Sequence, residues 1–308
     1  MVAQVRLVCR LWNKLATEHL FRNLTLRHDL ESLDTHFDYW LNLTDLAHVN
    51  KFARRVAIES ALQDYDGSCY DGHWPPSWAK EGIWPVFEDS IDRIIDMPNL
   101  DVIEIRFASC CAGRNANRDP WAPELEIANP ETAATRFHTL RAIVRAMEER
   151  SSRPNTSIIR ELVLRNLQNM ALPKDIADDL FHNIQRLHIK ITTENYGTEY
   201  PDEERPDLIH REELREFPRY LQNTLLPSVA HQLVELTISG KHWGSIPGEF
   251  NGKGLTFLRL NTLTLDGFVI LRKDQFDWIL EQKSLTALHL HNCTIATYCL
   301  VQQTEFVN

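Results

Sequence analysis

Two short patterns in this chain have the residue types and spacing that can bind metal ions. His289 and His291 alternate on a predicted strand, so they share one face and could begin a zinc-type site. No third ligand follows at a suitable spacing, and an outward-facing polar position is the preferred interpretation. Asp64-Tyr65-Asp66-Gly67 has the form of the start of a calcium-binding loop, but the acid required near the end of such a loop is missing. We therefore predict that the chain holds no metal ion and needs no cofactor.

Groups that could perform catalysis are equally sparse. Cys110 and Cys111 are adjacent, so their side chains point apart, and buried small residues are the preferred interpretation over redox chemistry. The acids Glu203 and Glu204 are more typical of solvated charge than of an acid and base pair. The sequence contains no GxSxG, GxxxxGKS/T, HExxH or GxGxxG motif. We therefore predict no catalytic residues and a protein that is not an enzyme.

Composition and charge exclude several classes of partner. The 308 residues are 43% hydrophobic and 25% charged, and the formal net charge is -10. A nucleic-acid-binding protein usually carries a basic face, and the strongest basic pair, Arg54-Arg55, is too small for one. No stretch of about 18 apolar residues is available to span a membrane. The six cysteines form no CxxC pair, which fits a reducing compartment, so we expect a cytoplasmic or nuclear protein.

The elements that must position any site follow from one recurring pattern, apolar-x-x-apolar-x-apolar. Its last two positions lie two residues apart and therefore on one face of a strand. Stacked side by side, such units form a parallel sheet over a continuous core. Eight matches begin at Phe21, Ala53, Leu100, Ile159, Ile184, Leu233, Leu260 and Leu285. They start 32, 47, 59, 25, 49, 27 and 25 residues apart, and three of these intervals are close to the roughly 20–29 residues of a leucine-rich repeat.

Helical patterns separate the predicted strands. The Asn-Pro-Glu run at 129–131 is typical of a helix start, and an apolar stripe follows it to Met147. Shorter stripes lie at 176–180, 214–225 and 276–280. This alternation predicts parallel strands joined by helical crossovers. We therefore predict an α/β fold in the form of an irregular leucine-rich-repeat-like solenoid; the alternative is an ordinary α/β domain with parallel strands.

Two segments do not fit the repeat. Residues 61–98 form an insertion that contains Trp74, Trp78 and Trp84 among several prolines. Because Trp is enriched at the centres of interfaces, these three side chains are candidates for a partner-binding lip. The preferred alternative is a small local core that covers one side of the solenoid. Residues 192–212 are rich in acids and are interpreted as a charged loop.

The N-terminal segment resembles the second half of an F-box. That half commonly reads as Leu, Val, Cys, a basic residue, one variable residue and Trp, and a Leu-Phe-basic segment then leads into the first strand. The matching residues are Leu7, Val8, Cys9, Arg10, Trp12, Leu20, Phe21 and Arg22. The remainder is similar to the degenerate leucine-rich-repeat-like domains that follow F-boxes in many fungal proteins. The resemblance implies a partial F-box or helical cap at 1–20 and the solenoid at 21–308.

In that family, the F-box docks on the Skp-type adaptor of a cullin-based ubiquitin ligase, and the solenoid holds a protein substrate. The resemblance assigns adaptor binding to Val5, Leu7, Val8, Cys9, Trp12, Leu15, Leu20 and Phe21. The first half of an F-box does not precede these residues, so the alternative is that they pack on the solenoid as an N-terminal cap. We expect an F-box-type substrate receptor or a degraded relative of one. The other candidates are a plain scaffold with no link to ubiquitin and, less favoured, an enzyme on a parallel-sheet fold.

Overall fold

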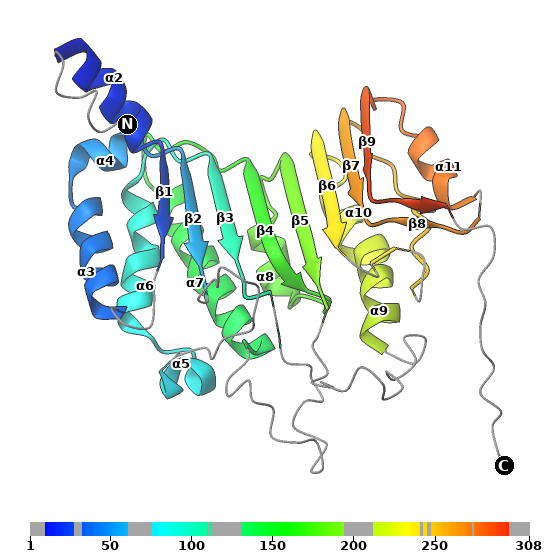
Figure 1. The fold of residues 1–308 in the computed structure, drawn as a ribbon, viewed down its shortest axis with the longest axis horizontal. Coiled ribbons are helices and arrows are strands. Elements are labelled where there is room, and N and C mark those ends of the chain that lie inside the picture. Colours follow the sequence, from blue (N-terminus) through cyan, green and yellow to red (C-terminus); the bar gives the residue numbers. More distant parts are fainter. Residues whose placement is uncertain are drawn as a thin grey trace.

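A large parallel sheet forms the centre of the molecule. The computed structural model describes residues 10–27, 33–60, 75–109, 111, 131–193, 212–240, 243–244, 248–272 and 274–295. Eight strands lie side by side in the order in which the chain forms them (Figure 1). They are β1 (Asn23–Leu26), β2 (Arg55–Glu59), β3 (Val102–Arg106), β4 (Glu161–Gln168), β5 (Arg186–Thr192), β6 (Glu235–Gly240), β7 (Thr262–Asp266) and β9 (Ala287–His291). Two short strands, β8 (Val269–Ile270) and β10 (Thr294–Ile295), form a separate parallel pair.

The register of the large sheet follows the signature found in the sequence. The second apolar position of every match falls in one row across the sheet, and the third falls in another. The first row runs through Leu24, Val56, Ile103, Leu162, Leu187, Leu236, Leu263 and Leu288. The second runs from Leu26 to Leu290, two residues further along each strand. Residues paired on neighbouring strands are therefore separated in sequence by the same intervals as the matches. The predicted α/β class with parallel strands is confirmed.

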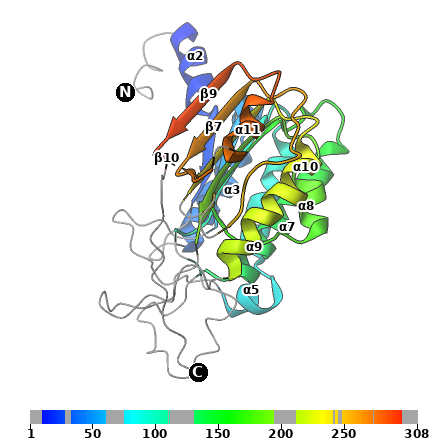
Figure 2. The ribbon, with the colours of Figure 1, turned by 90° about the vertical axis from the view of Figure 1, so that its right-hand side faces the viewer.

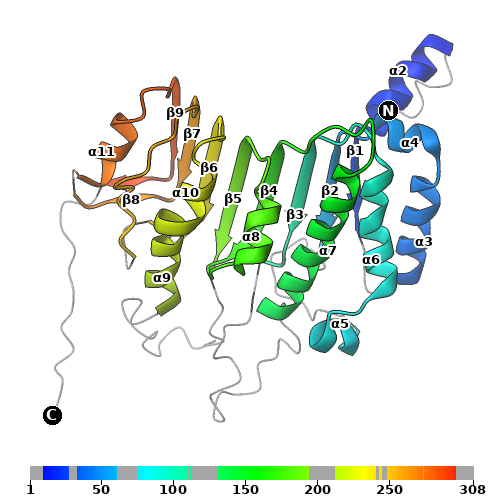
Figure 3. The same ribbon diagram turned by 180° about the vertical axis from the view of Figure 1, so that it is seen from behind.

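Helices cover one face of this sheet. Those between β1 and β3 are α3 (Leu33–Thr44), α4 (Ala47–Phe52), α5 (Pro76–Glu81), α6 (Pro85–Asp92) and the 3₁₀ turn η1 (Arg93–Asp96). Later ones are α7 (Ala133–Ser151), α8 (Lys174–Leu180), α9 (Glu212–Tyr220), the π-helical turn η3 (Leu221–Leu225), α10 (Leu226–Val229) and α11 (Asp274–Leu280). Figure 3 shows α6, α7, α8 and α9 in front of the strands, whereas the opposite view in Figure 1 shows the strands with no helix over them. Figure 2 shows the helices and the strands as two layers from the side.

The core lies between these two layers. In both apolar rows the side chains from β1 to β7 are buried. Each buried Leu or Ile contributes about 1.5–3 kcal/mol relative to an exposed one, so the rows supply much of the stability of the sheet. On β9 the equivalent residues, Leu288 and Leu290, are exposed. Among the described residues, the two core rows are therefore buried at the β1 edge of the sheet and exposed to solvent at the β9 edge.

The start of α7 differs from the prediction. Thr132 caps this helix: its Oγ1 accepts a hydrogen bond from the Thr135 amide at 3.2 Å, and the Thr135 hydroxyl accepts one from the Thr132 amide at 3.1 Å. Such a reciprocal pair satisfies two amides that have no partner within the helix. The helix thus begins after Glu131 rather than at it, while Asn129 and Pro130 lie outside the described residues.

The predicted stripe at 214–225 is confirmed, but not as one regular helix. Leu214, Phe217, Leu221 and Leu225 are all buried. Pro218 lies inside α9 and has no amide hydrogen to donate to the preceding turn. The chain then widens into the π-helical turn η3 before α10 continues.

Candidate interaction surface on the open face of the sheet

The open face is built by the residues that alternate with the core rows. On every strand the side chains on either side of a buried residue point to the opposite face of the sheet. The register aligns them into further rows, of which the central one is Thr25, Ala57, Glu104, Val163, His188, Thr237, Thr264 and His289. From β2 to β5 this face carries mostly charged side chains. From β6 to β9 it carries mostly Ser, Thr and His.

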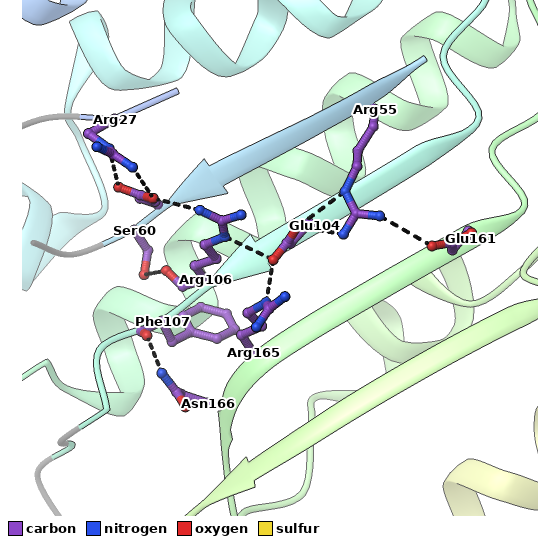
Figure 4. Close-up of polar contacts among 10 residues, drawn as sticks. Arg27, Arg55, Ser60, Glu104, Arg106, Phe107, Glu161, Arg165 and Asn166 are labelled. Carbon is purple, nitrogen blue, oxygen red and sulfur yellow. Dashed lines mark hydrogen bonds and ion pairs between the residues drawn. The ribbon is translucent and has the colours of Figure 1, made fainter. Parts of the chain in front are cut away.

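Glu104 on β3 is the centre of the charged half. Its carboxylate accepts hydrogen bonds from Arg55 Nη2 at 2.6 Å, from Arg106 Nε at 2.8 Å and from Arg165 Nε (Figure 4). Burial alone would raise the pKa of Glu104, but the hydrogen bonds and positive charges of these arginines lower its pKa to about 2. One carboxylate therefore binds three guanidinium groups that come from three neighbouring strands and balances the charge of only one of them.

Further ion pairs extend this centre in both directions. Towards β1, Glu59 accepts from Arg106 Nη1 at 2.9 Å and from Arg27 Nε at 3.2 Å. The hydrogen bond to Glu104 raises the pKa of Arg106, and the pairing with Glu59 adds to this effect.

Towards β5, Glu161 accepts from Arg55 Nη1 at 3.5 Å and from Arg186 Nε at 2.8 Å. Arg186 also donates to Asp101 at 2.9 Å. A continuous chain of alternating charge thus crosses from the end of β1 to β5.

The charges of this network lie at different depths. The Glu104 side chain is 1% exposed and that of Glu59 is also buried, whereas the Arg165 side chain is 51% exposed. Arg27 and Lys190 are exposed as well. The two central carboxylates, Glu104 and Glu59, therefore lie beneath the cations that they bind, whereas the Asp101 side chain at the edge of the network is 37% exposed. Around Glu104 and Glu59 the exposed charges are therefore those of Arg27, Arg165 and Lys190, although the whole chain has a net charge of -10.

A second ionic group lies at the carboxyl ends of β2 to β4. Glu131 Oε2 pairs with Arg136 Nη2 at 2.8 Å, and its two oxygens also accept from the Ser60 hydroxyl at 2.6 Å and the Ala108 amide at 2.8 Å. Arg136 in turn donates to the Asn166 carbonyl at 2.7 Å. Both charged side chains are buried. Because these contacts join the strand ends to α7 and to the residue just before its cap, this group holds the layers together.

An enzyme on this fold would need a pocket of polar groups near the carboxyl ends of the strands. A cavity of about 530 Å³ lies there, between α9 and the turn at 169–171 that follows β4. Among the described residues that line it there is no Ser, Cys or His. The Glu216 Oε1 atom forms an ion pair with Arg219 Nη1 at 3.0 Å. Burial raises the pKa of Tyr220.

The predicted adaptor-binding residues fall only partly within the described residues. Helix α2 (Arg10–Leu20) contains Trp12, and Val5, Leu7, Val8 and Cys9 lie outside the described range. Leu15 is exposed on this helix and Leu20 is half-buried.

Phe21, which follows α2, packs against the core. Its ring meets that of His48 edge-on, with 5.6 Å between the centroids. The structure therefore separates the predicted set into an exposed position on α2 and a position that anchors this helix to the domain.

The predicted partner-binding lip needs correction. Trp78 and Trp84 are both buried, and they pack edge-on against each other with 6.0 Å between ring centroids. Phe37 and Phe87 complete this aromatic cluster. Apolar rings of this size gain more from burial here than from exposure, so the alternative of a local core describes these two residues. Trp74 lies outside the described residues.

Sequence inspection missed the residues of the charged half. Glu104, Arg106, Arg165 and Lys190 occupy the variable positions of the signature and its flank, which carry no motif of their own. The available signal was positional: once the matches are aligned, these residues fall in rows on the face opposite the core. Of the basic pair considered from sequence, Arg55 belongs to the network, while Arg54 donates to the Asn99 carbonyl at 3.3 Å.

The chain matches no protein-family model, no characterised protein and no solved structure with which it was compared. Within the described residues, no group of three or more His, Cys, Asp or Glu side chains is placed to hold a metal ion. His289 and His291 are exposed on β9 and stack with 6.4 Å between ring centroids. No described helix is both long enough and apolar enough to cross a membrane.

Proposed function

We propose that this chain is a non-catalytic protein-binding module, a leucine-rich-repeat-like solenoid that holds a partner on the open face of its sheet. The observation that carries this proposal is the arrangement of the layers: eight parallel strands in chain order have helices on one face. The other face carries mostly polar side chains. A sheet face that none of the described helices covers is a surface on which another protein can lie.

The last two units support the repeat interpretation most directly. β9 pairs with β7 and β10 pairs with β8 at the same offset of 25 residues. Leu285, Leu288, Leu290, Cys293 and Ile295 fall at the positions of the leucine-rich consensus, in which Asn or Cys follows the strand. Cys293 Sγ donates to the Leu265 carbonyl of the preceding unit at 3.4 Å, as a residue that joins successive repeats would.

For residues 1–20 we propose adaptor docking. In this proposal the chain is an F-box-type substrate receptor, or a degraded relative of one, that acts in the cytoplasm or nucleus and binds an unidentified protein substrate. Support comes from the sequence match and from α2, which lies beyond the β1 end of the sheet in Figure 1 and exposes Leu15.

The second candidate is a scaffold without a link to ubiquitin. Buried Ala16 and half-buried Phe21 favour it, because they tie α2 to the domain as a cap would.

Co-purification with a Skp-type adaptor tests the docking proposal. The variant Leu15→Asp places a charge on an exposed apolar position of α2, and Tyr39→Asp makes the same kind of change on exposed α3 as the matched control. We expect wild type and Tyr39→Asp to retain the adaptor and Leu15→Asp to lose most of it, since one buried charge in an apolar contact costs about 2 kcal/mol or more. Equal capture by all three, or none by wild type, contradicts adaptor docking and leaves the scaffold.

Binding by the open face is tested separately from the adaptor. Peptides selected by display against the wild-type chain are re-measured on a Thr237→Trp variant, in which a large ring stands in the central row of that face. We expect binding to be lost in this variant and to be kept in Asp175→Trp, which places the same ring at an exposed position of α8 on the helical layer. Peptides that bind both variants equally contradict recognition by the open face.

A further inference from the structure

The layering of charge on the open face indicates the chemistry of the partner. We propose that the partner presents an extended acidic segment and that this segment binds across β3, β4 and β5 at Arg106, Arg165 and Lys190. Since it takes the open face as the binding surface, this proposal rests on the proposed function and specifies its ligand.

The three cations form one row. The register places Arg106 opposite Arg165, and Arg165 opposite Lys190. Neighbouring strands lie about 4.8 Å apart, so the row is about 10 Å long. Like charges directly opposite each other on neighbouring strands destabilise a sheet. Three adjacent cations therefore need negative charge nearby, and the described acids balance only part of their positive charge.

The described acids leave this row incompletely neutralised. Glu104 and Glu59 bind Arg106, and Glu104 also binds Arg165. Arg165 makes this contact through Nε, which leaves both of its Nη groups for an end-on pair with a second carboxylate. Lys190 is exposed and forms no ion pair with a described residue. The share of N–H donors that bind no described acid therefore rises from Arg106 on β3 through Arg165 on β4 to Lys190 on β5.

The depth of the acids explains why an incoming anion is attracted rather than repelled. Buried Glu104 and Glu59 fix the guanidinium groups in place, so little side-chain freedom is lost when a ligand binds. The exposed groups that the ligand meets are cationic. A carboxylate-rich segment complements this surface, and the acidic character of the chain as a whole, with its net charge of -10, disfavours binding of such a segment elsewhere.

A short peptide fits this row better than a nucleic acid. Alternate residues of an extended peptide lie about 6.6–7 Å apart, so two or three carboxylates can reach the three cations. A nucleic acid would extend beyond the row and meet Glu161 and Asp101 on the same side of the sheet, and its affinity depends on many phosphate contacts. We therefore assign the row to an acidic protein segment.

The test is fluorescence anisotropy on the full chain with labelled short peptides of equal length. One peptide is glutamate-rich, the second has Gln for every Glu, and a single-stranded oligonucleotide serves as the other polyanion. We expect the glutamate-rich peptide to bind, its Gln counterpart to bind at least about tenfold more weakly, and the difference to shrink at about 0.5 M salt. Equal affinity for the Gln peptide, or tighter binding of the oligonucleotide, overturns the proposal.

Paired charge reversals locate the site. Arg165→Glu with Lys190→Glu should weaken the glutamate-rich peptide by about tenfold or more, because each reversal replaces attraction by repulsion. Arg141→Glu with Lys283→Glu makes the same change of net charge at exposed positions away from the open face and should leave the affinity unchanged. An equal loss in both double variants shows an effect of net charge alone and overturns the assignment of the row.

Two further outcomes identify other occupants. If replacing the acids at 194–207 by Gln and Asn is required before any peptide binds, the chain's own acidic segment occupies the row, and a separate partner is overturned. Light scattering that shows a dimer dependent on Arg165 and Lys190 overturns it in favour of a second copy. Selected peptides that need the open face but are neutral or basic overturn the acidic ligand while the proposed function stands.

Discussion

The two halves of the open face rest on the same scaffold and differ in chemistry. From β2 to β5 the face carries a connected network of arginines and acids around Glu104, and from β6 to β9 it carries mainly hydroxyls and imidazoles. Behind both halves, the same apolar rows continue in register from β1 to β9. The sheet therefore forms with ion pairs and without them.

The comparison indicates that the sheet requires the apolar rows, whereas the ion-pair network is an addition to it. Replacing buried ion pairs by apolar groups is often neutral or stabilising, because the charges must be desolvated. The hydroxyl-rich half, where His188 Nδ1 and Thr237 Oγ1 lie 2.9 Å apart at its border, shows the less costly solution in the same molecule. Under our proposal the charged half serves recognition, and the following predictions test whether the two halves differ in stability and in binding.

The largest effect is expected from removing the central acid. Glu104→Gln leaves Arg55, Arg106 and Arg165 close together without their shared carboxylate, so we expect the free energy of unfolding to fall by about 3–5 kcal/mol. Denaturant unfolding followed by circular dichroism measures this loss.

The matched change in the other half is Thr264→Val, at the same row position on β7. There we expect a change within about 0.5 kcal/mol, because no charge is left without a partner. Similar losses in both variants would show that the two halves do not differ as described.

A pH dependence of intermediate size should follow from the same residue. The pKa of Glu104 falls from its usual 4.5 to about 2 in the folded chain. Its stabilising effect is therefore fully present above about pH 4.5 and is lost as the pH falls through the folded value, a total of about 3 kcal/mol.

Unfolding measured from pH 6 down to pH 2 checks this window. The difference in unfolding free energy between wild type and Glu104→Gln should stay constant at higher pH and shrink below about pH 4.5. A difference that stays constant to pH 2 would mean that this carboxylate does not titrate in the stated range.

The smallest effect is expected where the two halves meet. Ser239 on β6 lies opposite Lys190, so Ser239→Glu gives that cation a cross-strand acid. We expect a gain of about 0.2–1 kcal/mol in unfolding free energy, and a weaker affinity for acidic peptides because the new acid competes for Lys190. Ser239→Gln is the uncharged control, and an unchanged peptide affinity in Ser239→Glu would argue against Lys190 as part of the site.

Much of the fold could be predicted from the sequence because its main determinant is local. Each match of the signature places two apolar residues on one strand face, and identical spacing in neighbouring units fixes the register. The stripe at 176–180 similarly became α8, with Ile176 and Leu180 buried. Patterns of this kind depend only on residues a few positions apart, which a single sequence displays.

The candidate surface depends on contacts that are distant in sequence. Arg55 and Glu161 are 106 positions apart and meet only because β2, β3 and β4 align in one register. The burial of Trp78 and Trp84 likewise depends on how α3, α5 and α6 pack around them. Composition marks such residues as able to form interfaces, but only the tertiary arrangement decides whether they face solvent.

Site-specific photo-cross-linking tests the central claim most directly. A glutamate-rich peptide that carries a photoreactive group is bound to the full chain, irradiated, and the attachment points are read by mass spectrometry. If the open face is the recognition surface, the cross-links should fall on β3 to β5 around Arg106, Arg165 and Lys190, and excess unlabelled peptide should remove them. Cross-links concentrated on α7 to α9, on the opposite side of the sheet, would contradict it.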